Sequence, residues 1–141
     1  MCTLRSVILA IGEPLPIREQ GLEAVVAKCK EQLAPGLPLM AKYGAEKIVI
    51  AYEPVWSIGT GVTASPEQAQ ETHKALRDYL KEAVSPEFAD AVRIQYGGSA
   101  NAKNAPELSA CPDVDGFLVG GASLKPEISD IVKTIAAAKK A

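Results

Sequence analysis

A glutamate follows an apolar run in the middle of the chain, and glycines follow the glutamate at short spacing. Residues 48–52 are apolar and lead directly into Glu53, and the next eight residues read PVWSIGTG. A surface turn is the simplest interpretation of this segment. The alternative is a carboxylate held at the end of a strand, where it could act as a general base.

Other glycines stand where further strands should end. They follow three more apolar runs, as Gly12, as GGS at 97–99 and as Gly-Gly at 120–121. Several backbone N–H groups that point at one spot can hold a phosphate, and residues without a Cβ allow the close approach. A single Gly-Gly pair after a strand is usually a tight turn. Glycines at several neighbouring strand ends together predict an anion site.

The elements that must position these residues alternate along the chain. Short apolar runs bounded by turn residues predict strands at 6–11, 47–52, 92–96 and 115–119. Apolar residues at helical spacing predict a first helix from Arg18 onward, which Pro35, Gly36 and Pro38 end in a turn-rich connection.

Two later helices have clear start signals. Ser65 is predicted as an N-cap, with Pro66 in the first turn and Gln68 completing a capping box. His73 lies among polar residues of this helix, so we expect it at the surface. Pro126 opens a last helix, and its inward-facing residues are predicted to be Ile128, Ile131, Val132 and Ile135.

Four strand-then-helix units in series predict an α/β fold with parallel strands and right-handed crossovers. A doubly wound open sheet and a (β/α) barrel both fit this pattern. In either fold the ligand site lies at the carboxyl ends of the strands. Glu53 and the glycine-bearing loops should therefore converge on one face. No low-complexity linker divides the chain, so residues 1–141 are predicted to form a single domain.

Composition excludes several classes of function. The chain has 141 residues, 48% of them hydrophobic, and 15 basic against 17 acidic residues give a net charge of -2. The charges are scattered, which argues against nucleic acid and anionic membranes as partners. No apolar run approaches the ~20 residues of a membrane span, and no cleavable signal is evident. Cys2, Cys29 and Cys111 lack metal-site spacing and are predicted to be reduced thiols in a cytoplasmic protein.

Four segments resemble the triosephosphate isomerase family, in its order and approximate spacing. They are AIGE (10–13), AYEPVWSIGTG (51–61), YGGS (96–99) and DGFLVGGASLKP (115–126). The resemblance covers essentially the whole chain but only the second half of the family's barrel, from the fifth strand to the eighth helix. It implies a parallel (β/α) TIM-barrel type fold of which four of eight β/α units are present, a half barrel.

The resemblance implies roles for particular residues of these segments. Glu53 matches the catalytic base that interconverts dihydroxyacetone phosphate and glyceraldehyde 3-phosphate, and a closed, dry site would suit its proton transfer. The residues that would bind the substrate phosphate are Gly59, Ser99, Gly120 and Gly121. The lid and hinge residues would be Glu13, Pro54, Val55, Trp56, Gly61 and Tyr96. Within that set, Glu13 would anchor the indole N–H of Trp56, and Tyr96 with Ser99 would latch the closed lid.

Other implications concern partners and open questions. The substrate would be a triose phosphate, neither a metal nor an organic cofactor is indicated, and full-length members are expected to be homodimers. Arg18 has a family counterpart near the lid base, but it could equally be a solvated charge. Departures from the family pattern are Ala10 for cysteine, Ser57 for alanine, Val62 for lysine, and Ala100 for valine.

The segments that carry the family's catalytic lysine, its electrophilic histidine and its dimerisation loop lie upstream of the matched half. Without the lysine and histidine, nothing would stabilise the enediolate, so we expect these 141 residues alone to be weakly active or inactive. Two hypotheses remain. The sequence is a truncated or partial triosephosphate isomerase, or it is a non-catalytic module that binds phosphate or pairs with another half barrel through its edge strands near Val7 and Phe117.

Overall fold

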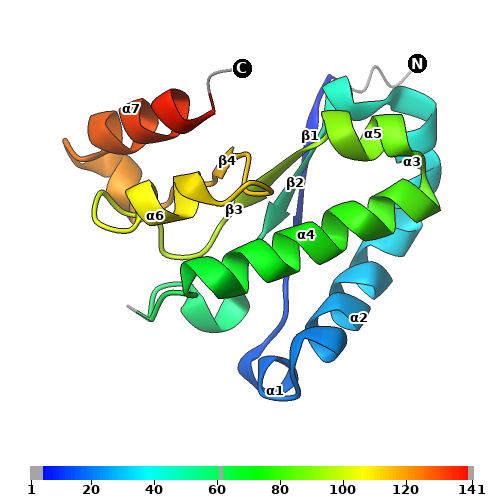
Figure 1. Ribbon diagram of the computed structural model, residues 1–141, viewed down its shortest axis with the longest axis horizontal. Helices are drawn as coiled ribbons and strands as arrows, with labels where there is room; N and C mark the ends of the chain where they lie inside the picture. Colours follow the sequence, from blue (N-terminus) through cyan, green and yellow to red (C-terminus); the bar gives the residue numbers. More distant parts are fainter. Residues whose placement is uncertain (1–4, 61, 140–141) are drawn as a thin grey trace.

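The computed structural model describes residues 5–60 and 62–139, and a four-stranded parallel sheet forms its centre. The strands are β1 (Val7–Ile11), β2 (Ile48–Tyr52), β3 (Arg93–Tyr96) and β4 (Gly116–Phe117). Their spatial order is the same as their order in the chain, with β1 and β4 at the edges (Figure 1). This α/β arrangement confirms the predicted fold class and matches half of a TIM barrel. The fourth strand is shorter than the predicted 115–119.

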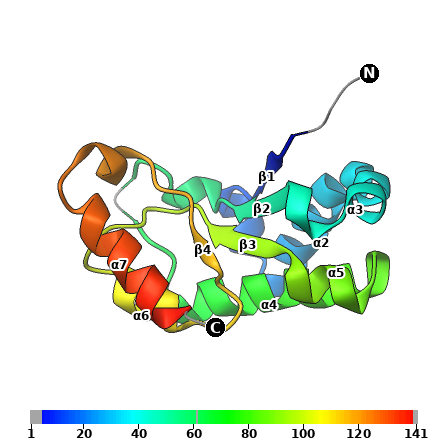
Figure 2. The ribbon, with the colours of Figure 1, turned by 90° about the horizontal axis from the view of Figure 1, so that it is seen from above.

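Helices connect the strands, with short 3-10 segments between them. They are α1 (Leu15–Arg18), α2 (Leu22–Leu33), η1 (Ala34–Gly36), α3 (Leu37–Tyr43), η2 (Ala45–Lys47), η3 (Val55–Ser57), α4 (Pro66–Ala83), α5 (Pro86–Ala91), α6 (Ala105–Ala110), η4 (Gly121–Leu124) and α7 (Ile128–Ala138). Figure 2 shows α4 and α5 running beside the sheet, with α6 and α7 beyond the β4 edge.

The core lies between the helices and one face of the sheet. Alternate residues of β2 and β3, such as Ile50 and Ile94, pack in one buried cluster with residues of α2 and α4. Residues of the opposite strand face differ, because Ile8 is 55% exposed and Arg93 is also exposed. Val49 and Ala51 of β2 lie on this same inner face and are buried, so among the described residues the inner face is exposed in part, whereas the outer face is a packed core.

Two predictions about helices are wrong. The turn-rich connection at 35–38 is helical, as η1 and α3, because Pro35 and Pro38 each stand in a first turn, where the missing N–H is not needed. The predicted inward face of α7 is only partly buried. Ile131 is buried, but Val132 is 55% exposed, because no described element covers that side of the helix.

The capping box that the sequence predicts for α4 is present. Ser65 Oγ accepts the N–H of Gln68 at 3.2 Å, and Gln68 Oε1 accepts the N–H of Ser65 at 3.0 Å. The prediction that His73 lies at the surface is wrong, because this residue is fully buried on the inward face of the same helix. It shares the i, i+3, i+4 stripe of Ala69 and Leu76, and its ring meets the Tyr52 ring edge-on at 5.6 Å.

A buried arginine ties α4 to the start of β4. Arg77 Nε lies 2.9 Å from Asp113 Oδ1, and Arg77 Nη2 lies 2.6 Å from Asp115 Oδ2. The same guanidinium donates to the carbonyls of Ala89 and Val92, just before β3. The Arg77 side chain therefore links α4, the segment before β3 and the segment before β4. Its buried charge is paired with carboxylates, as a charge removed from water requires.

Two of the three predicted thiols can be placed. Cys29 is buried on α2, and Cys111 is buried after α6, and both are free. Burial, with a smaller effect of the nearby Glu13 carboxylate, raises the pKa of Cys29 to about 12. Cys2 lies outside the described residues.

Candidate functional site

Glu53 stands one residue past the carboxyl end of β2, and its backbone is held by the neighbouring strand. The N–H of Glu53 donates to Ile11 O at 2.7 Å, and the N–H of Val55 donates to Glu13 O at 3.1 Å. These bonds extend the β1–β2 pairing beyond the strands themselves. The half-buried carboxylate is therefore carried by rigid backbone on the side where the strands end.

Two glycines of neighbouring loops make room for Glu53. A Cβ on Gly97, after β3, would stand 2.5 Å from Glu53 Cγ, and a Cβ on Gly12, after β1, would collide with the backbone carbonyl of Glu53. Only glycine permits both approaches. These two glycines let the loops after β1 and β3 close around the Glu53 backbone and side chain.

The hinge that follows Glu53 is anchored on a buried acid. Trp56 Nε1 donates to Glu13 Oε1 at 2.9 Å, so the predicted anchoring bond is present. Tyr52 OH donates to the same oxygen at 3.0 Å, a contact that the sequence does not reveal because Tyr52 resembles one more apolar strand residue. Glu13 is fully buried. Burial, and less strongly this carboxylate, raise the pKa of Tyr52.

The predicted lid spans residues 54–64, and the part of it after Trp56 is held by a hydrogen bond at each end. Ala64 N donates to Tyr96 OH at 3.3 Å, and Ser99 Oγ donates to Ser57 O at 2.7 Å. Gly59 lies between these ends and has φ of +69°, a conformation that glycine adopts readily. Gly61, the other predicted lid glycine, lies outside the described residues. The two residues predicted to latch the lid therefore contact its two ends.

A pocket of about 460 Å³ opens beside Glu53 at the carboxyl ends of β3 and β4. It is lined by Ile58, Gly59, Gly97, Gly98, Ser99, Ala100, Asn101, Gly120, Gly121, Ala122, Lys125 and Glu127. All four residues predicted to bind phosphate are in this lining. Glu53 itself is not, but it packs against Gly97, which is. Three loops from distant parts of the chain therefore surround one space next to the carboxylate.

The lining includes residues that were not predicted to belong to the site. Lys125 contributes the only positive side chain among the lining residues, and its Nζ lies 3.9 Å from Glu127 Oε1. Glu127 Oε2 accepts the N–H of Ala102 at 3.2 Å. The sequence feature that could have identified Lys125 as a site residue is its position four residues past Gly121. Arg18, whose role was left open, is half-buried at the end of α1 and does not line the pocket.

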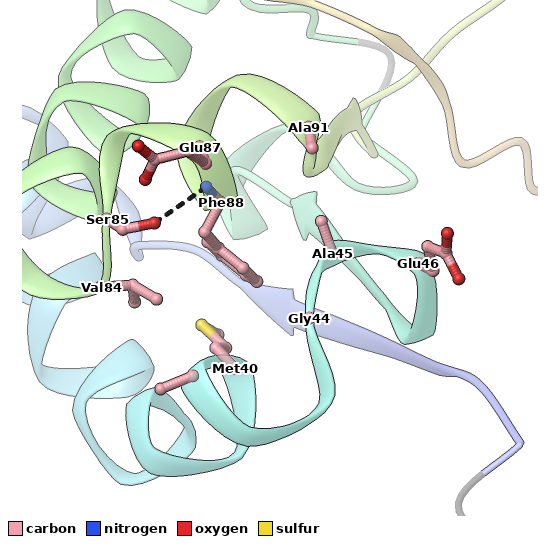
Figure 3. Close-up of a pocket in the computed structure, with 10 residues that line it drawn as sticks. Met40, Gly44, Ala45, Glu46, Val84, Ser85, Glu87, Phe88 and Ala91 are labelled. Atoms are coloured by element: carbon pink, nitrogen blue, oxygen red, sulfur yellow. Dashed lines mark hydrogen bonds between the residues drawn. The ribbon is translucent and has the colours of Figure 1, made fainter.

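A second hollow, of about 420 Å³, lies at the opposite end of the sheet (Figure 3). It is formed where η2 leads into β2 and where α5 precedes β3. Met40 and Phe88 supply much of its apolar wall, and Ser85 Oγ accepts the N–H of Phe88 at 3.1 Å as the cap of α5. This hollow contains none of the predicted site residues, and helix capping accounts for its polar contact.

Two further properties bear on the site. Within residues 5–60 and 62–139, no group of three or more His, Cys, Asp or Glu side chains is arranged to hold a metal ion. None of the helices described is long and apolar enough to cross a membrane.

Comparison with known proteins gives a single family. Residues 3–137 match the triosephosphate isomerase family. The chain is 54% identical over 129 residues to the triosephosphate isomerase of Debaryomyces hansenii, covering 92% of this chain and 50% of that protein. It is 55% identical over 126 residues to the enzyme of Coprinopsis cinerea, with 89% and 49% covered. For Taenia solium the identity is 52% over 128 residues, with 90% and 50% covered. The chain spans about half the length of these relatives. With a match of this extent, the chain belongs to the triosephosphate isomerase family.

Proposed function

We propose that this chain supplies the carboxyl-terminal half of a triosephosphate isomerase, which interconverts dihydroxyacetone phosphate and glyceraldehyde 3-phosphate. One observation carries the proposal. The Glu53 carboxylate packs against Gly97 at the rim of a pocket that Gly59, Ser99 and Gly120–Gly121 help to line. A carboxylate that would act as the general base thus lies beside a space with the backbone donors that a phosphate needs.

In this mechanism the pocket fixes the phosphate and Glu53 moves the proton. The carboxylate would take a proton from the carbon next to the substrate carbonyl, leaving an enediolate, and return it to the neighbouring carbon. No atom is gained or lost, so the reaction needs neither a redox partner nor a second substrate. The bonds of Trp56 to Glu13 and of Ala64 to Tyr96 would hold the lid over the substrate and keep water out.

The isolated chain should nevertheless be a poor catalyst. Charge that develops on the enediolate oxygen must be stabilised, and this stabilisation usually accelerates such reactions more than any other single effect. By the family resemblance, the lysine and histidine that do this belong to the other half of the barrel. We therefore propose that activity requires those groups, that a completed protein is a homodimer, and that it works in the cytoplasm.

The test joins this chain to the amino-terminal half of the Debaryomyces hansenii relative and measures triose phosphate isomerisation. Glu53→Gln should lower kcat by about 10²–10⁴-fold, because general-base catalysis contributes that much, and should leave inorganic phosphate binding unchanged. Glu87→Gln is the matched control, since Glu87 lies on α5 at the far end of the sheet. A Glu53→Gln protein that keeps its turnover would refute the assignment of the base.

A second candidate function rests on the open side of the sheet. Within the described part of the chain, β1 and β4 have a strand on one side only, and Ile8 is exposed on the inner face. A non-catalytic module could use these edges to pair with another half barrel while keeping the phosphate pocket. Such a module has no use for Glu53. If the joined barrel shows no isomerase activity while the isolated chain binds phosphate, this second function is favoured.

A further inference from the structure

Ser57 stands where the family pattern usually has alanine. Its hydroxyl is buried beside the site. The residue ends η3, at the base of the lid, and is fully buried. A Cβ on Gly98 would stand 2.8 Å from Ser57 Oγ, so the loop after β3 lies directly against this hydroxyl. A buried hydroxyl needs a hydrogen-bond partner, and the identity of that partner is informative.

The partner is Ser99, one of the residues that line the phosphate pocket. The N–H of Ser99 donates to Ser57 Oγ at 3.3 Å, and Ser99 Oγ donates its own proton to Ser57 O at 2.7 Å. The side-chain donor of Ser99 is therefore occupied by the lid backbone. The backbone N–H is the only other donor that Ser99 can offer to a ligand.

We infer that the Ser57 hydroxyl is an internal substitute for a phosphate oxygen, and that it occupies the N–H of Ser99 while the pocket is empty. A phosphate that binds in the pocket must take this N–H from Ser57. At 3.3 Å the bond is longer than the usual length of about 2.9–3.0 Å, so it can be exchanged for a bond to an anion, which is shorter and stronger. This inference rests on the proposed function, because it concerns the same phosphate pocket.

The displaced hydroxyl has a second neighbour. Tyr96 OH and Ser57 Oγ both lie against Gly98; burial raises the pKa of that phenol, and the Ser57 side chain opposes this effect to a lesser extent. Tyr96 OH in turn accepts the N–H of Ala64 at the far end of the lid. Phosphate binding in the pocket would thus change the contacts of the lid near both Ser57 and Ala64. With alanine at this position the Ser99 N–H would be free, and phosphate would bind without displacing anything.

The test compares inorganic phosphate binding by the 141-residue chain and its Ser57→Ala variant, followed by the amide NMR signals of Ser99, Gly120 and Gly121. The Kd should fall about two- to tenfold in Ser57→Ala, the range that one net hydrogen bond represents. In the absence of phosphate, the Ser99 amide should exchange with solvent faster in this variant. Ser109→Ala is the matched control, because it removes a buried hydroxyl that donates to Pro106 O on α6, and its Kd should be unchanged.

The outcomes separate the inference from the proposed function. If the unsubstituted chain shows no phosphate-dependent shifts, the proposed phosphate pocket is wrong, and the inference is overturned with it. If that chain binds phosphate but Ser57→Ala binds with equal or weaker affinity, only the inference is overturned. An unchanged exchange rate of the Ser99 amide in Ser57→Ala would also overturn the inference, because it would mean that the Ser57 hydroxyl does not occupy this N–H.

Discussion

Glu53 is held by its backbone and by the absence of side chains around it. Its N–H is bonded to Ile11, and Gly12 and Gly97 leave no space for a Cβ. A long side chain on a fixed backbone, confined by glycines, has few conformations and so loses little entropy when a substrate binds. At the scale of the residue, the site depends as much on missing side chains as on the carboxylate itself.

A second residue, His73, should make stability depend on pH. Burial lowers the pKa of His73 to about 4, which favours the neutral form in the folded state. The folded-state pKa is below the unfolded value of about 6.5, so the unfolded chain binds more protons between these values. The contribution of neutral His73 to the free energy of unfolding should be fully present above about pH 6.5. It should be lost as the pH drops toward 4, which lowers the free energy of unfolding by on the order of 3 kcal/mol.

Urea denaturation at several pH values checks this expectation. The chain has one histidine, so a His73→Gln variant removes the whole contribution while keeping a polar side chain that can donate to Asp113 O. Carboxylates also titrate at low pH, and they remain in both proteins. The slope of unfolding free energy between about pH 4 and 6.5 should therefore be smaller in the variant. Equal slopes would mean that His73 is not held neutral by burial.

At the scale of elements, α4 connects the site to the rest of the sheet. Its inward face carries His73 against Tyr52, which bonds to Glu13 beneath the hinge. One turn further along, Arg77 pairs with Asp113 and Asp115 before β4, the strand that leads to Gly120 and Gly121. Strands β2 and β4 are not neighbours in the sheet, so apart from β3, which pairs with both, α4 is the element that contacts residues near both ends of the site.

The ion pairs of Arg77 should matter for stability much more than the exposed pairs do. Arg77→Ala leaves Asp113 and Asp115 without their counter-charge and should lower the free energy of unfolding by about 3–5 kcal/mol. Lys74→Ala is the control, because Lys74 pairs with Asp78 on the exposed side of the same helix, and its loss should hardly change the free energy of unfolding, since exposed ion pairs contribute little. Chemical denaturation measures both. Similar small losses would show that Arg77 is replaceable.

At the scale of the whole molecule, the two faces of the sheet are covered to different extents. The outer face is packed by helices, whereas Ile8 and Arg93 are exposed on the inner face, and β1 and β4 form its edges. A barrel has no edges and fills its interior with side chains. The described residues thus have the exposed surfaces of a barrel cut between two strands.

Amide hydrogen exchange can show whether these surfaces are completed by another half barrel. Residues 7–11 and 116–117 should gain protection when the amino-terminal half of the Coprinopsis cinerea relative is added, because new strand pairing would hold their free N–H groups. Residues 48–52 serve as the internal reference, since β2 already has a neighbour on each side. Protection that stays the same at both edges would show that the two halves do not associate.

The sequence alone determined where the strands lie along the chain, the capping box at Ser65 and the glycine loops, because these depend on local periodicity and turn chemistry. Its motifs also led to the family and to Glu53. Tertiary structure decided the rest. His73 and Arg77 look like polar helix residues, yet both are buried, because which helix face meets the sheet depends on packing across the chain. The bond of the Ser99 N–H to Ser57 joins residues 42 positions apart. No local pattern encodes a contact of that kind, since folding alone brings its two ends together.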